Sequence, residues 1–269
     1  MNKNSIPDTS TWPQLGIPER NTYRVNDEVV DMRRPTVKSR ALRVPALPQH
    51  VIIDLDKTAL MLIDMQNDFV AADGWIGSMG IDLAPARALI SPINGVTATL
   101  RAQGVPILWV NWGVRPDRLN LSPGTQHPFN PNGRAPGLAG SFVGAGRSHQ
   151  LLEKGSWGAK VVDELVQGPR DIHVDKHRIS GFWDTPLNAI LNNLAIKTLL
   201  FAGVNADHCV LGTLMDANFH GYDTILLEDC TATTSPDFCL KATIHNVRFC
   251  FGFTTTSQEL VASVGELMP

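Results

Sequence analysis

Three side chains in this sequence have the chemical types and positions needed for covalent hydrolysis of an amide. Asp64 closes the apolar run TALMLID and Lys176 closes DIHVDK, while Cys209 follows the run TLLFAGV by five residues, where a helix is expected to begin. In an open α/β sheet, ligands bind beyond the carboxyl ends of the strands. If these three strands are neighbours, a carboxylate, an ammonium and a thiol meet at one edge of the sheet.

Each of the three residue types has a part in the expected chemistry. A free thiol has a pKa of about 8.5 and is mostly protonated at neutral pH. Unpaired backbone N–H groups at the start of a helix and a nearby Lys176 ammonium would favour the thiolate of Cys209. Asp64 would accept the thiol proton and later give it to the leaving amine. The N–H groups of Asn205 and Cys209 could form an oxyanion site, so we predict amide hydrolysis through a thioester.

Taken alone, each residue also has a structural explanation. A lone aspartate after a strand often caps a helix, a lone lysine is usually exposed, and a lone cysteine is often a small core residue. The hypothesis therefore rests on the combination. The eight histidines are expected to be structural or exposed, because His208 should point away from its neighbour Cys209 and His173 lies within a strand.

Apolar runs alternate with segments of helical spacing, which predicts a three-layer αβα fold around an open, mostly parallel sheet. Strands are expected at 57–64, 105–111, 171–176, 197–204 and 222–229, and helices at 84–104, 157–166, 185–195, 207–221 and 235–247. Residues 113–147 are rich in Gly and Pro, as expected of a lid or substrate wall. Residues 1–50 are expected to form an extended arm with a short strand near RALRVPAL, or a partly disordered tail, and residues 51–269 to form one domain.

Composition excludes several classes of function. The 269 residues are 43% hydrophobic and carry a net charge of −3, which offers no basic surface for nucleic acid or anionic lipid. No apolar run reaches the roughly 18–20 residues of a membrane-spanning helix. The first residues contain no apolar signal core, and the four cysteines have no paired or metal-ligand spacing, so a cytoplasmic protein with reduced thiols is expected.

Three blocks of the sequence resemble the isochorismatase-like cysteine hydrolases: TALMLIDMQNDFV, VDKHRISGFWDTPLNAIL and FAGVNADHCVLGTLMDA. The resemblance covers about residues 55–265. It implies a catalytic triad of Asp64, Lys176 and Cys209. It also implies a cis peptide between Val204 and Asn205, with oxyanion donors from the amides of Asn205 and Cys209. Because isochorismatases proper lack the nucleophilic cysteine, its presence favours amide cleavage.

Further resemblance points to the branch that cleaves ureides, which includes enzymes acting on ureidoacrylate, biuret and triuret. The sequence lacks the Asp-x-His cluster of the nicotinamidase branch, having NWGVRPD at that place, so no metal and no cofactor are expected. Gln66, Asn111, Trp112 and Phe182 are expected to contact the substrate. A homo-oligomer, dimer or tetramer, is also expected from the resemblance. A nicotinamidase-like carboxamide hydrolase and a non-catalytic thiol redox or binding module remain alternatives.

Overall fold

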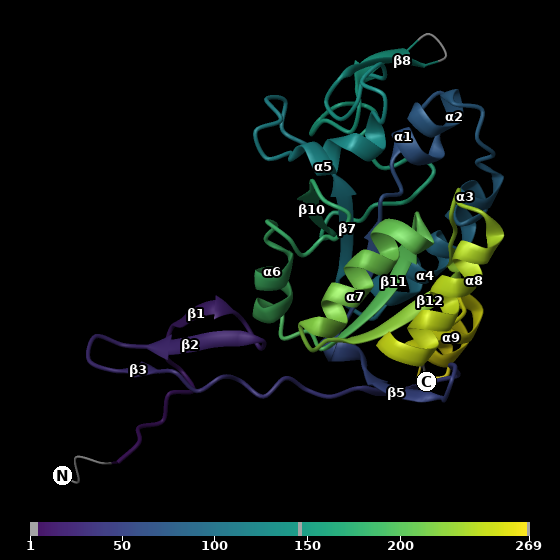
Figure 1. The fold of residues 1–269 in the computed structure, drawn as a ribbon. Helices are drawn as coiled ribbons and strands as arrows, with labels where there is room; N and C mark the ends of the chain where they lie inside the picture. The colour runs from purple at the N-terminus through teal and green to yellow at the C-terminus, as the bar shows by residue number, and fades with distance from the viewer. Residues whose placement is uncertain (1–4, 145–146, 268–269) are drawn as a thin grey trace.

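Six parallel strands form the central sheet of the computed structural model, which describes residues 5–144 and 147–267 (Figure 1). In spatial order they are β10 (Ile172–Lys176), β7 (Ile107–Trp112), β6 (Thr58–Ile63), β11 (Thr198–Gly203), β12 (Asp223–Thr231) and β13 (Phe253–Thr255). The three strands that precede Asp64, Lys176 and Cys209 therefore lie within four adjacent positions. Helices cover both faces, which confirms the predicted three-layer α/β fold.

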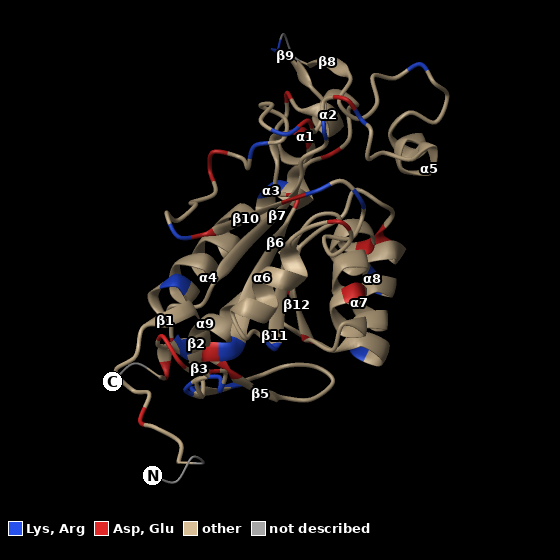
Figure 2. Ribbon diagram, turned by 90° about the vertical axis from the view of Figure 1, so that its left-hand side faces the viewer, with Lys and Arg blue, Asp and Glu red and all other residues tan. Residues whose placement is uncertain are grey.

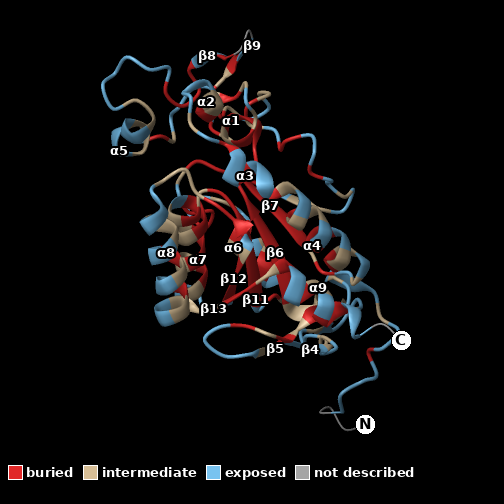
Figure 3. Ribbon diagram, turned by 90° about the vertical axis from the view of Figure 1, so that its right-hand side faces the viewer, coloured by how far each residue is buried: buried red, intermediate tan, exposed pale blue. Residues whose placement is uncertain are grey.

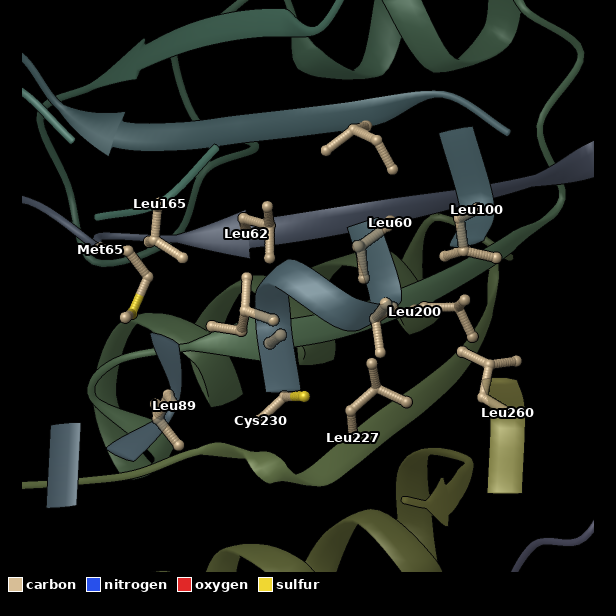
Figure 4. Packing of buried hydrophobic residues seen from close by; sticks show 14 of the residues in the cluster. Leu60, Leu62, Met65, Leu89, Leu100, Leu165, Leu200, Leu227, Cys230 and Leu260 are labelled. Carbon is tan, nitrogen blue, oxygen red and sulfur yellow. The ribbon is translucent and has the colours of Figure 1, made fainter. Parts of the chain in front are cut away.

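Alternate residues of each central strand enter two separate cores. Leu60 and Leu62 of β6 pack in one core with residues of α4 (Ile90–Ala102) and α9 (Ser257–Gly265), as Figure 4 shows. These two helices lie on the same side of the sheet (Figure 3). Met61 and Ile63 face the opposite layer, which contains α6 (Leu187–Asn193) and α7 (Leu211–Phe219). All six residues of β6 are buried. A strand covered on both faces needs apolar residues at every position, which explains the continuous runs in the sequence.

The remaining helices follow the predicted order with one exception. The expected helix at 84–104 is divided into α3 (Ala84–Ala88) and α4, and α8 (Asp237–Asn246) follows β12. The expected helix at 157–166 is wrong, because this segment is irregular. Its carbonyl groups accept hydrogen bonds from another part of the chain: Lys160 O from the Asn67 N–H at 2.8 Å and Gly158 O from the Asp68 N–H at 3.0 Å.

The segment between β7 and β10 contains little regular structure. It includes the short helix α5 (Pro123–Gln126), the single turn η2 (His127–Phe129), and the antiparallel pair β8 (Ser141–Gly144) and β9 (Arg147–Gln150). Together with α1 (Asn67–Val70) and α2 (Trp75–Ser78), it lies at the carboxyl ends of the strands (Figure 1). These elements therefore stand where a ligand of this fold would bind.

The N-terminal 50 residues divide into two parts. The strands β1 (Gln14–Ile17), β2 (Asn21–Val25) and β3 (Val30–Asp31) form a small antiparallel sheet that projects from the body (Figure 1). In contrast, β4 (Ala41–Val44) pairs with β5 (Val51–Asp54), and Leu42 and Val44 are buried in the core. The hairpin around β4 and β5 thus packs with the α/β domain, and only the residues before it form an arm.

Acidic and basic side chains are interspersed along the ribbon in the view of Figure 2. Among residues 5–144 and 147–267, no helix is long and apolar enough to cross a membrane.

Candidate active site

Asp64 lies immediately after β6 and is 1% exposed. Its φ of 53° is in the left-handed region, which aspartate tolerates better than most residues, and such conformations often occur at functional sites. Its backbone N–H donates to Val110 O at 3.2 Å, and its Oδ1 accepts the Trp112 N–H at 3.2 Å. The carboxylate is thus fixed between the ends of β6 and β7.

Lys176 is the last residue of β10 and is fully buried. Its Nζ lies 3.0 Å from Asp64 Oδ2 and 3.3 Å from Cys209 Sγ, and it donates to Arg178 O at 3.1 Å. It also lies 4.2 Å from the centre of the Trp112 ring. A buried ammonium requires such partners, because a charge without them is very costly in the protein interior. The structure therefore brings the three expected residues into contact.

Cys209 lies in the π-helical turn η3 (Ala206–Val210), which continues directly into α7. The Asn205 carbonyl accepts the N–H groups of His208 at 3.1 Å and Val210 at 3.2 Å. The peptide bond between Val204 and Asn205 is cis, which is the bond that the resemblance singled out. The Asn205 side chain is held by Thr234, to whose hydroxyl it donates at 3.0 Å.

The protonation of the resting thiol differs from the expectation. Burial raises the pKa of Cys209 to about 12, the Asp64 charge adds to this effect, and Lys176 opposes it. Burial also raises the pKa of Asp64, against the influence of Lys176 and of a hydrogen bond with Cys209. The expected shift of Cys209 toward the thiolate is therefore wrong, because removal from water outweighs the nearby cation and helix start. The site holds a neutral thiol beside its base.

A cavity of about 380 Å³ opens over the sulfur. Its wall contains Asp64 and Cys209 together with side chains from α1, α2, η2 and the segments after β10, β11 and β12. The lining residues are Asp64, Phe69, Trp75, Ile76, Trp112, Pro128, Phe129, Ile179, Val204, Asn205, His208, Cys209 and Thr234.

Of the four residues expected to contact substrate, only Trp112 lines this cavity. The Gln66 carboxamide is used within the protein: its Oε1 accepts the Trp112 N–H at 2.9 Å, and its Nε2 donates to Trp112 O and Ala159 O, each at 2.7 Å. Asn111 lines a separate cavity on the other face of β7. Phe182 is buried in the core against His220 and Tyr222. The expected substrate contacts of Gln66, Asn111 and Phe182 are therefore corrected, because none of these residues lines the cavity over Cys209.

Most residues of the cavity wall have no signal in the sequence that would identify them. Trp75 and Phe129 come from short helical turns in irregular segments, which have no periodic pattern to indicate a buried face. His208 is exposed, as expected, with 54% of its side chain accessible to solvent, and it also lines the cavity.

Within residues 5–144 and 147–267, no group of three or more His, Cys, Asp or Glu side chains is arranged to hold a metal ion. The absence of metal from the reaction remains a prediction.

Comparison with known proteins gives a consistent result. The isochorismatase domain model matches residues 58–259. The chain is 32% identical over 241 residues to the ureidoacrylate amidohydrolase RutB of Rhizobium rhizogenes, covering 87% of this chain and 94% of the relative. A cysteine hydrolase structure from Pseudomonas syringae matches with a TM-score of 0.67 and 21% identity, covering 85% of this chain and 99% of the other. The N-carbamoylsarcosine amidase of Thermoplasma acidophilum matches with a TM-score of 0.57 and 29% identity, covering 76% and 98% respectively.

Proposed function

Because the chain belongs to the isochorismatase family and is a hydrolase of amide C–N bonds, we propose that it cleaves a small ureide through a thioester on Cys209. The observation that carries the proposal is the contact of Lys176 with both Asp64 and Cys209 at the floor of one cavity. Ureidoacrylate, biuret and triuret are the first substrates to test. The relative named as a ureidoacrylate amidohydrolase supports this choice.

In the first half of the reaction, the sulfur attacks the ureide carbonyl while the thiol proton passes to Asp64. The N–H groups of Asn205 and Cys209 then stabilise the oxyanion of the tetrahedral intermediate. Lys176 stabilises the negative charge on the sulfur and on Asp64 as the proton moves. Asp64 returns the proton to the leaving nitrogen, the C–N bond breaks, and ammonia or an amine departs.

In the second half, Asp64 accepts a proton from water as the hydroxyl attacks the thioester carbonyl. The same two N–H groups stabilise the second intermediate. The C–S bond breaks, the sulfur recovers its proton from Asp64, and the acid or carbamate is released. Both halves use one base and one oxyanion site, so the mechanism needs no group outside these residues.

The proposal is tested with Cys209→Ala and Asp64→Asn variants. On an active ureide, Cys209→Ala should lose turnover while its circular dichroism spectrum stays unchanged. Intact-mass measurement of the wild-type protein during turnover should detect an acyl adduct on Cys209, whereas Asp64→Asn, which lacks the base needed for acylation, should form none. Turnover by Cys209→Ala at the wild-type rate would exclude the proposal, and loss of activity with a chelator would count against the metal-free mechanism.

Two alternatives make different predictions. A nicotinamidase-like enzyme would release ammonia from nicotinamide and not from the ureides. A redox sensor would hydrolyse none of them and would show a thiol that peroxide oxidises reversibly. The raised pKa of Cys209 disfavours the sensor, because sensor cysteines have a low pKa and are accessible to solvent.

We also propose that the protein is a homo-oligomer, a dimer or a tetramer. Apolar side chains are exposed both on the arm, at Leu15 and Met32, and on the body, at Phe219 and Phe249. Light scattering at micromolar concentration should give a multiple of the 29.4 kDa chain mass, and a monomer would contradict the proposal. The cytoplasmic location stays a prediction.

A further inference from the structure

The wall of the catalytic cavity combines polar and apolar side chains. Its polar residues besides Cys209 are Asp64, Asn205, His208 and Thr234. The rest of the wall is aromatic and aliphatic. This composition indicates that the polar residues contact the reacting amide and that the remainder of the substrate is apolar.

Three aromatic rings pack against one another in the apolar part of the wall. The ring centre of Phe129 lies 5.3 Å from that of Trp75 and 5.1 Å from that of Trp112. Phe129 belongs to η2, whereas Trp75 and Trp112 come from α2 and β7, so the segment after β7 completes the aromatic group. Aromatic rings with these separations offer flat apolar surfaces to a planar ligand.

In the described part of the chain, the cavity wall contains no lysine and no arginine. Lys176 is fully buried behind the wall and is paired with Asp64. The guanidinium of Arg178 is bound to Asp184 by hydrogen bonds of 2.8 and 3.0 Å.

His208 is the one titratable nitrogen base on the wall among the described residues, and its Nε2 lies 3.3 Å from Asp207 Oδ2. A positive charge on His208 would thus be offset by Asp207. A substrate carboxylate would meet no free cation in this cavity, and it would be repelled by Asp64.

The aromatic group offers an apolar surface, and the described part of the cavity wall contains no lysine or arginine. We therefore propose that the preferred substrate is an uncharged ureide with a flat apolar substituent. The reacting urea group lies at Cys209 and the substituent lies against the aromatic group of Trp75, Trp112 and Phe129. This inference rests on the proposed function and narrows its substrate class to ureides other than ureidoacrylate, which carries a carboxylate, and biuret and triuret, which have no apolar substituent. A cavity of about 380 Å³ has the size of a small-molecule site and can hold a single ring beside the urea group.

The test measures binding to a Cys209→Ser variant by isothermal titration calorimetry, so that turnover does not interfere. Four probes separate the two parts of the inference. Phenylurea and biuret differ in apolar surface, whereas 4-ureidobenzamide and 4-ureidobenzoate have similar shapes and differ in charge. Phenylurea should bind at least tenfold more tightly than biuret, and the benzamide at least tenfold more tightly than the benzoate. Equal or reversed affinities in either pair, or no detectable binding of any probe, would overturn the inference.

A second comparison assigns the effect to the aromatic group. Adding Phe129→Ala should weaken phenylurea binding by about tenfold, since it removes one face of the aromatic site. Phe249→Ala is the matched control, because Phe249 is 81% exposed and does not line the cavity. Unchanged affinity in the Phe129→Ala protein would also overturn the inference.

These outcomes are distinct from failure of the proposed function. If the wild-type protein forms a Cys209 adduct with ureidoacrylate or biuret while phenylurea binds poorly, the inference fails and the thioester mechanism stands. If phenylurea binds selectively and no ureide forms an adduct, the mechanism fails.

Discussion

The ammonium of Lys176 lies 3.3 Å from the sulfur of Cys209, and both side chains are buried. Lys176 is also the cation that opposes the effect of burial on the pKa of Cys209 and of Asp64. The site therefore depends on one buried charge to favour the ionised forms of two groups whose pKa values are raised by burial.

Replacing Lys176 with Met should nearly abolish the reactivity of Cys209. Without the ammonium, the pKa of the thiol rises further, and the rate of alkylation by iodoacetamide at pH 8 should fall at least tenfold. Turnover of an active ureide should fall by about 10²–10⁴, the range for loss of proton-transfer and electrostatic groups. Alkylation of Lys176→Met at the wild-type rate would exclude this role for the lysine.

The same substitution should destabilise the protein, since it leaves Asp64 buried without its partner. The expected loss in the free energy of unfolding is about 3–5 kcal/mol, measured by urea denaturation. The control is the double variant Asp64→Asn with Lys176→Met, which removes both charges. It should recover most of the stability and none of the activity, and this separates the catalytic role of the pair from its structural role.

Activity should decrease on the acid side at a higher pH than an ordinary aspartate would cause. Burial raises the pKa of Asp64 above 3.8, so this base takes up a proton earlier as the pH falls. Since only the carboxylate can accept the thiol proton, kcat/KM should drop through a midpoint clearly above 3.8. The pH profile is measured where circular dichroism shows an intact fold, and a constant kcat/KM down to pH 4 would contradict the assignment of Asp64 as the base.

Gln66, which directly precedes α1, and Asn111 of β7 both carry side-chain amides, yet their replacement should have different effects. Gln66→Ala removes the hydrogen bonds that the Gln66 side chain makes with the N–H and O of Trp112 and with Ala159 O. Because these buried backbone groups then lack a partner, the free energy of unfolding should fall by about 2–4 kcal/mol. Asn111→Ala should leave KM unchanged, because Asn111 lines a different cavity. A large rise in KM for Asn111→Ala would restore it as a substrate-binding residue.

The case of Asn111 also indicates where sequence reasoning reached its limit. The apolar runs and the residues that follow them were enough to predict the parallel sheet and the meeting of Asp64, Lys176 and Cys209. Along β7, however, Asn111 and Trp112 point to opposite faces, and a strand buried on both faces carries no alternation that would separate them. The pKa of Cys209 was expected to be lowered and is instead raised, because the extent of burial around Cys209 is a property of the packed structure.

Gly158 should tolerate no side chain, because the segment around it is closely packed against Asp68. A Cβ at Gly158 would lie 2.0 Å from Asp68 Oδ2. That carboxylate cannot easily move: its Oδ1 lies 2.6 Å from His149 Nε2 and its Oδ2 accepts the Leu152 N–H at 2.9 Å. Oδ1 also accepts the N–H of Trp75, the residue whose ring forms part of the cavity wall, at 3.3 Å. Displacing Asp68 would therefore disturb both the fold and the apolar part of the cavity.

Gly158→Ala is expected to lower the free energy of unfolding by about 1–3 kcal/mol, the usual cost of overpacking, and to raise KM for an active ureide more than it lowers kcat. The matched control is Gly95→Ala in the exposed part of α4, where a Cβ meets no atom within 4 Å. There the substitution should stabilise the protein by about 0.5–1 kcal/mol, because alanine favours the helix, and should leave KM unchanged. If the two variants have the same stability and the same KM, Asp68 does not position the cavity wall, and Trp75 must be held by other contacts.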